Sequence, residues 1–182
     1  MRLLTGALVV FMAGSLFADS NYLGVDKCAK MCHKSKAKGD QLSVWKESSH
    51  AKAFSVLATP AALETAKKVG LAGDPQKSEK CLKCHVTAFG VDASRLDSTY
   101  AKEDGVGCEA CHGAGSGYAK LKIMKDKKAA LAAGLIIPDE KTCVKCHNTD
   151  SPNYKKFNFV EMAKKIAHPM PKQAEAKEGE TK

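Results

Sequence analysis

The sequence predicts a mainly α-helical fold with long loops and little β-structure. Apolar residues recur at helical spacing after His50, at 53, 54 and 57, and again at 159, 162, 163 and 166, a pattern typical of amphipathic helices. Residues 86–91 form the one short strand-like stretch, which we interpret as a loop. Of the 182 residues, 27% are charged and only 6% are aromatic. Side chains alone are therefore not expected to build a large core.

The first 18 residues have the pattern of a secretory signal peptide. Arg2 precedes an apolar run that ends at Phe17, and Ala18 precedes a polar stretch. The run is short for a membrane-spanning helix, so cleavage after Ala18 is favoured over an uncleaved anchor. No second long apolar run follows, so we expect no integral membrane span after cleavage. Export to the periplasm would place the cysteines in an oxidising space, where few free thiols persist.

The rest of the chain is expected to form one domain, residues 19–170, and a disordered charged tail, residues 171–182. Thr59 and Pro60 indicate the start of a helix that runs through residue 69 and is ended by a glycine. Pro138 and Asp139 indicate the cap of another short helix. The segment 159–166 is expected to be a helix that ends before a proline at 169, with Met162 packed in the core.

Every cysteine belongs to a pair that is followed directly by histidine. Three pairs have the spacing C-x-x-C-H, and the first has one extra residue, Met31. Two thiols at this spacing can add to the two vinyl groups of a haem, and the adjoining histidine can then bind the iron. The cysteines are Cys28, Cys32, Cys81, Cys84, Cys108, Cys111, Cys143 and Cys146, and the adjoining histidines are His33, His85, His112 and His147.

Two other classes also use paired cysteines. A disulfide framework does not require histidine after each pair, and a zinc ribbon does not require it directly adjacent. A local disulfide, Cys28 to Cys32, stays open for the first pair because of its extra residue. The motifs therefore predict four covalent haem c groups, which would also supply the buried apolar mass that the side chains lack.

Two histidines remain for the distal sides of four irons. His50 and His168 are the expected distal ligands, since each lies at a predicted helical apolar stripe beside the motifs. Methionine sulfur is the other common axial donor, and it raises the potential of a haem. Met124 is the best remaining choice, because the other candidates are trapped in a motif, packed on a helix or adjacent to His168. At least one iron is then expected to be five-coordinate.

The chain carries a formal net charge of +9. Nucleic acid is not an expected partner of an exported chain, and no aromatic-basic readout motif is present. Some lysines are expected to offset haem propionates. The remainder could steer docking onto an acidic redox protein or simply form a solvated face.

Beyond the motifs, four segments resemble the tetrahaem cytochrome c-554 family: residues 27–57, 81–90, 105–115 and 157–168. They cover most of the mature chain in the same order. Founding members of that family carry electrons away from hydroxylamine oxidoreductase in ammonia-oxidising bacteria. The resemblance implies a compact multihaem fold, in which His50 pairs with His112 on the third haem and His168 pairs with His147 on the fourth. It also implies a five-coordinate second haem at His85.

The chain departs from the family at the first haem. The family places a distal histidine shortly after the third motif, and this chain has none there. Met124 is therefore favoured as the substitute, and the extra residue Met31 is a second departure. Both bear on the potential of the first haem.

Two classes of function compete. The first is a periplasmic electron carrier between an oxidoreductase and a cytochrome or quinone-linked acceptor, which is not an enzyme. The second is a reductase of a small nitrogen oxide at the open iron near His85. The carrier is favoured, because a reductase needs proton donors over the iron and none can be placed. A subunit of a polymeric haem wire is a third reading.

Overall fold

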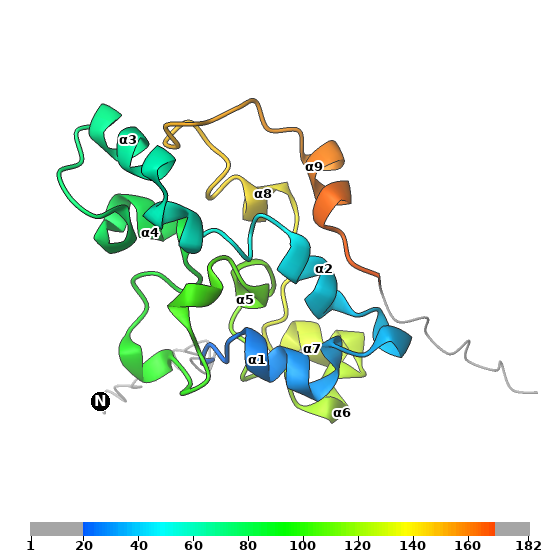
Figure 1. Ribbon diagram of the computed structural model, residues 1–182. Coiled ribbons are helices and arrows are strands. Elements are labelled where there is room, and N and C mark those ends of the chain that lie inside the picture. The colour runs from blue at the N-terminus through cyan, green and yellow to red at the C-terminus, as the bar shows by residue number, and fades with distance from the viewer. Residues whose placement is uncertain (1–19, 170–182) are drawn as a thin grey trace, which may run out of the picture.

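The computed structural model of the chain describes residues 20–169 (Figure 1). The expected signal peptide with its cleavage after Ala18, the charged tail 171–182 and Met170 lie outside these residues. The described α-helices are short: α1 Val25–Cys28, α2 Gln41–Glu47, α3 Pro60–Lys68, α4 Glu79–His85, α5 Cys108–His112, α6 Leu121–Met124, α7 Lys127–Ala132, α8 Glu140–Cys143 and α9 Phe159–Ile166.

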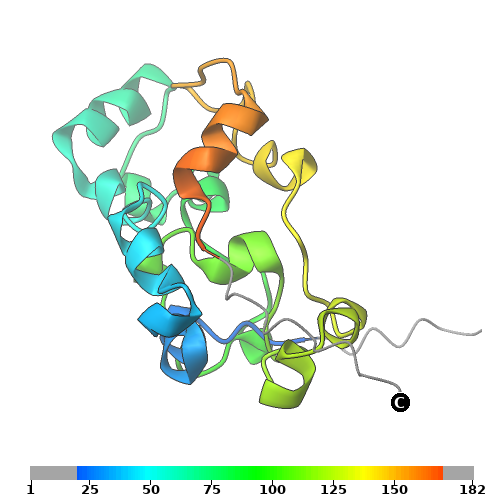
Figure 2. The same cartoon turned by 90° about the vertical axis from the view of Figure 1, so that its right-hand side faces the viewer.

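The described part of the chain is mainly helix and loop, as the sequence predicts. Its β-structure consists of one isolated bridge between Tyr22 and Leu96. Residues 86–91 are a loop, as expected. In both views α3 lies at one end of the molecule and α6 and α7 lie at the other, with α5 between them (Figures 1 and 2). Within residues 20–169, no helix has the length and apolar content to cross a membrane.

Buried apolar side chains are few and mostly small. Among them are Leu23 and Val25, around the start of α1, and Phe54 and Leu57, before α3. Other large apolar side chains are open to solvent, and Val160 is 61% exposed. This agrees with the expectation that side chains alone do not form a large core.

Local sequence signals account for the helix ends. The hydroxyl of Thr59 accepts a hydrogen bond from the amide of Ala62 at the start of α3, and Pro60 is the first helical residue. At α8, Asp139 and Thr142 form a reciprocal capping box. The helix predicted at 159–166 is present as α9.

Two local expectations were wrong. The apolar stripe after His50 does not continue a helix, because α2 ends at Glu47 and Ser48 adopts an extended conformation. His50 instead lies in a turn, although Ala53, Phe54 and Leu57 are buried as the stripe predicts. Met162 is 38% exposed rather than packed in the core, since the other stripe residues of α9 are only half-buried and leave its side chain uncovered.

Candidate haem sites

The extra residue of the first motif is absorbed by a change of helix type. Residues Ala29–His33 form a π-helix that continues directly from α1, and Cys28 lies at the junction. A π-turn accommodates one more residue than an α-turn without interrupting the helix. Cys28, Cys32 and His33 therefore stay on one short helical segment in spite of the longer spacing.

The other three motifs also lie on short helical segments. The second motif closes α4, and the third motif makes up the whole of α5. In the fourth, Cys143 ends α8 and the chain continues as a turn, in which the amide of His147 donates to the carbonyl of Cys143 over 3.0 Å. In the first three motifs the second cysteine and its histidine end a helical segment, and in the fourth they lie in a turn just after one.

All eight cysteines are half-buried free thiols, and no disulfide joins Cys28 to Cys32 or any other two of them. Thiols of different motifs lie side by side instead. A hydrogen bond with Cys108, followed by burial, raises the pKa of Cys28. Burial, followed by the nearby Cys84, raises the pKa of Cys146 to about 12.

Burial, followed by the charge of Cys143, raises the pKa of Cys111. The two thiol hydrogen bonds place the first motif beside the third and the second motif beside the fourth. These neighbours do not follow the order of the sequence.

Three of the four proximal histidines are held through the same ring atom. Their Nδ1 atoms lie 3.1 Å from Oε1 of Gln41 (His33), 2.6 Å from the carbonyl of Ala53 (His85) and 3.0 Å from the carbonyl of Ile136 (His112). Metal-binding histidines commonly donate one ring N–H to such an acceptor, which fixes the tautomer and leaves the other nitrogen free for the metal. His147 is held differently, by stacking on Phe157 with ring centroids 4.8 Å apart.

The two remaining histidines each face one of these proximal histidines. The ring centroids of His50 and His147 are 6.0 Å apart, and those of His112 and His168 are 5.9 Å apart. Two imidazoles that bind opposite sides of one metal through bonds of about 2 Å have centroids about 6 Å apart. Burial, followed by the facing histidine, lowers the pKa of both His50 and His168. Both are therefore favoured as neutral imidazoles, the form that binds a metal.

This pairing is the reverse of the one that the resemblance implies. His50 faces the fourth motif rather than the third, and His168 faces the third rather than the fourth. Two contacts fix the segments that carry these histidines. The loop of His50 is tied to the segment before α5 by a hydrogen bond from the amide of Val106 to the carbonyl of His50. The segment after α9 is tied to α2 by a hydrogen bond from Gln41 to the carbonyl of Pro169.

Met124 lies in an apolar hollow with the first motif. The hollow is partly open to solvent, and α6 and the loop before it form the wall that faces the motif. Its lining residues are Cys28, Cys32, His33, Gly115, Tyr118, Ala119, Leu121 and Met124. The structure thus brings Met124 and the first motif into one site.

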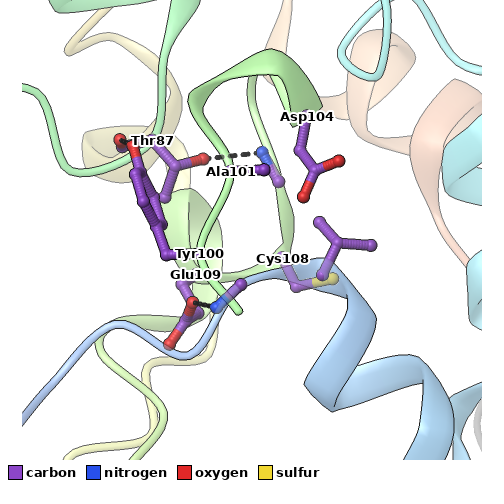
Figure 3. A pocket seen from close by; sticks show the side chains of 9 residues that line it. Thr87, Tyr100, Ala101, Asp104, Cys108 and Glu109 are labelled. Carbon is purple, nitrogen blue, oxygen red and sulfur yellow. Dashed lines mark hydrogen bonds between the residues drawn. The ribbon is translucent and has the colours of Figure 1, made fainter. Parts of the chain in front are cut away.

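A buried carboxylate, which sequence reasoning missed, anchors the third motif to the first. Glu109 is 4% exposed and accepts hydrogen bonds from the amides of Leu23, Gly24 and Gly115, at 2.6 to 2.8 Å. Figure 3 shows Glu109 and Thr87 among the residues that line a small hollow beside Cys108. The sequence offered one signal, a glutamate between the two cysteines of a motif. If a residue at such a position is buried, its charge needs partners, because charged residues are rarely fully buried unless they are paired.

Thr87 fixes the backbone before the third motif. Its hydroxyl accepts from the amide of Gly107 at 2.7 Å and donates to the carbonyl of Gly105 at 2.9 Å, while its own carbonyl accepts from the hydroxyl of Tyr100 (Figure 3). Burial raises the pKa of Tyr100 to about 12, so this donor stays protonated at neutral pH. Gly105 has a φ of +68°, and a Cβ there would lie 2.9 Å from the carbonyl oxygen of His50. The loop of His50 therefore needs glycine at this position.

Comparison with known proteins gives one family. Residues 27–113 match the family described as cytochrome c554 and c-prime. Cytochrome c-554 of Nitrosomonas europaea is 36% identical over 120 residues. The chain is therefore similar to the cytochrome c-554 family over these stretches. The aligned residues are 64% of this chain and 48% of that relative, so the chain spans about half the length of the curated relative that it matches. No solved structure matches it.

The residues present fit covalently bound haem, which the family implies. Unpaired thiols stand beside oriented histidines, and two imidazole pairs have the separation of trans ligands. Nδ1 of His168 is buried and has no hydrogen-bond partner in the described part of the chain. A zinc-type site does not fit equally well, because in residues 20–169 no three His, Cys, Asp or Glu side chains gather around one point.

Proposed function

We propose that this protein binds four haem c groups in the periplasm and carries electrons between an oxidoreductase and a cytochrome or quinone-linked acceptor. The observation that carries the proposal is the pair of facing imidazoles at the third and fourth motifs, 5.9 and 6.0 Å apart. Haem, when bound, supplies an iron centre that accepts and releases one electron.

The chain's own residues divide into three roles. The eight cysteines would hold the haems as thioethers, which also removes the cost of burying their polar thiols. His33, His85, His112 and His147 would be the proximal ligands, and His50 and His168 the distal ligands of the fourth and third sites. Acceptors on Nδ1 and a stacked phenyl ring fix the proximal imidazoles before any electron moves, so little reorganisation accompanies the transfer.

The first and second sites would differ from the other two. Met124 shares the hollow of the first motif, which supports its sulfur as the second ligand there. His85 faces no second histidine among the described residues, which supports a five-coordinate second site. We propose a carrier rather than an enzyme. At two of the four sites a second imidazole would fill the remaining ligand position of the iron, which leaves no position there for a substrate.

Mass spectrometry of the purified, exported protein tests the count and the location. We expect the mass of the chain from residue 19 onward plus four haems; a smaller number of haems would refute the proposed count. Electron paramagnetic resonance of the oxidised protein then separates the carrier from a reductase. A high-spin signal that is consumed with turnover of nitric oxide would favour the enzyme, whereas reversible reduction without turnover of nitrogen oxides supports the carrier.

A further inference from the structure

The positive charge of the chain is concentrated around one site. Residues 27–38 contain five lysines and no acidic residue, and residues 119–128 contain five lysines and one aspartate. The net charge of these two segments is +9, which equals the formal net charge of all 182 residues. The remaining 19 basic and 19 acidic residues cancel. The excess charge of the molecule therefore lies on two short segments.

These two segments form the walls of the hollow at the first motif. Cys28, Cys32 and His33 line it from the first segment, and Ala119, Leu121 and Met124 line it from the second. We call their ten lysines the basic collar: Lys27, Lys30, Lys34, Lys36, Lys38, Lys120, Lys122, Lys125, Lys127 and Lys128.

Most of the collar is free to meet a partner. Nine of its lysines are exposed, and Lys27 is half-buried. Within the described residues, Lys27 and Lys30 form ion pairs, with Asp97 and Asp26, and the other eight form none. The propionates of a single haem are too few to neutralise this set. Unpaired lysines so close together repel one another, and a surface of opposite charge would relieve that repulsion.

The first motif also lies beside another motif. α1 packs against α5, and the thiols of Cys28 and Cys108 are hydrogen-bonded. A group held at the first site could therefore pass electrons on to the third site.

We propose that the basic collar is the docking surface for an acidic patch on a redox protein, so that the first site is the port through which that partner exchanges electrons. This proposal rests on the electron-carrier function proposed above. Charge of this kind chiefly raises the association rate and orients the encounter, and salt screens it. Neither segment contains an aromatic side chain other than His33, so the stacking platforms that hold single-stranded nucleic acid are lacking.

The test compares two variants of equal charge in the mature haem-loaded protein. The collar variant changes Lys36, Lys122, Lys125 and Lys127 to Glu. The control variant changes four exposed lysines away from the hollow to Glu, namely Lys46, Lys68, Lys155 and Lys156. The probe is a flavodoxin, a small acidic flavoprotein, whose affinity is measured by calorimetry and whose electron-transfer rate is measured by stopped flow. A small uncharged reductant measures the access to the haems themselves.

At low ionic strength we expect the collar variant to lose about 10-fold or more in association rate and affinity, since steering by charge spans about 10 to 1,000-fold. The control variant should lose at most about 3-fold, and about 0.5 M salt should remove the difference. Equal losses in both variants, or none in either, would overturn the proposal. So would equally tight, collar-dependent binding of a DNA oligonucleotide, which would indicate a general polyanion site. Failure of the unaltered protein to be reduced by the uncharged reagent would instead refute the electron-carrier function.

Discussion

At the scale of single residues, the proposed ligation of the first site depends on one sulfur atom. Met124 is the last residue of the four-residue helix α6, and its side chain lines the hollow of the first motif. A methionine ligand stabilises the reduced state of iron more than a second imidazole does, so it raises the potential. This chain would thus hold its first haem at a higher potential than a relative with histidine there.

We therefore expect Met124→Ala to lower the midpoint potential of one haem and leave the other three unchanged in a spectroelectrochemical titration. The absorption band that arises from sulfur bound to ferric iron should disappear as well. Met124→His should also lower the potential but keep the iron low-spin, because an imidazole replaces the sulfur. Met162→Ala, on an exposed methionine of α9, is the matched control; the same loss in that variant would contradict the assignment.

The orientation of the proximal histidines shows what a single sequence cannot give at this scale. The motifs identify His33, His85 and His112 as candidates. The groups that orient them are a glutamine side chain and two backbone carbonyls, one of them 32 residues away in the chain. Every residue has a backbone carbonyl, so the sequence does not indicate which carbonyl accepts a hydrogen bond from a given histidine.

At the scale of elements, α5 with the third motif connects segments that are distant in the sequence. The carboxylate of Glu109 binds two amides of the segment before α1 and one amide after α5. Three charge-assisted bonds satisfy a charge that burial would otherwise disfavour. These bonds fix α5 against the segment that leads into the first motif, because two donors lie before α1 and the third follows α5.

We expect Glu109→Gln to destabilise the fold by about 3 kcal/mol, since an amide brings an N–H toward buried N–H donors and loses the charge. The midpoint of urea unfolding of the haem-loaded protein, followed by far-ultraviolet circular dichroism, measures this change. Glu103→Gln, on an exposed neighbour, should change the free energy of unfolding by less than about 0.5 kcal/mol. Equal shifts in the two variants would mean that the three amides do not depend on the carboxylate.

Element prediction succeeded where the signal was local. The cap at Thr59, the capping box at Asp139 and the stripe of α9 each depend on residues within a few positions, and each helix is present. The helix expected through His50 failed because its apolar stripe is real but its backbone is interrupted at Ser48. The apolar residues after His50 are buried by segments distant in the sequence, and not because they lie on one face of a continuous helix. The sequence shows that the first motif has one extra residue, but it does not show that a π-helix accommodates that residue.

At the scale of the whole molecule, acid stability can be traced to a carboxylate that ties distant segments together. Asp97 accepts hydrogen bonds from the amide and hydroxyl of Thr99 and from Lys27, and its backbone amide donates to the carbonyl of Tyr22. The hydrogen bond from the Thr99 side chain is the largest cause that lowers the pKa of Asp97 from 3.8 to about 2. A lowered pKa in the folded state contributes stability above pH 3.8, and that contribution is lost as the pH falls toward about 2.

We expect Asp97→Asn to be less stable than the unaltered protein at pH 7 and equally stable near pH 2. The gap should close between about pH 4 and pH 2, as followed by urea unfolding at a series of pH values. Glu47→Gln, on an exposed helix residue, serves as the control and should follow the unaltered protein throughout. A gap that is independent of pH would show that the effect comes from packing rather than from charge.

The neighbours of the motifs, first beside third and second beside fourth, lay beyond prediction from the sequence for the same reason as the histidine partners. Motif spacing fixes which residues can take a haem, but three-dimensional neighbours depend on loops such as that of His50, which crosses the fold. The pairing of His50 and His168 is the clearest case, since the structure sets His50 against His147 and His168 against His112, the reverse of what the resemblance implies.

That reversed pairing has a consequence for how the protein is made. Each proposed thioether site is complete within five or six consecutive residues, so haem could be joined to an unfolded chain as it emerges. The proposed second ligands come from opposite ends of the sequence: His50 would pair with a motif nearly a hundred residues later, and His168 with an earlier one. Attachment would thus be a local event and ligation a late one that needs the folded chain. Under the proposed assignment, a chain cut short before α9 would keep its covalent haems and lack the second ligand of the third site.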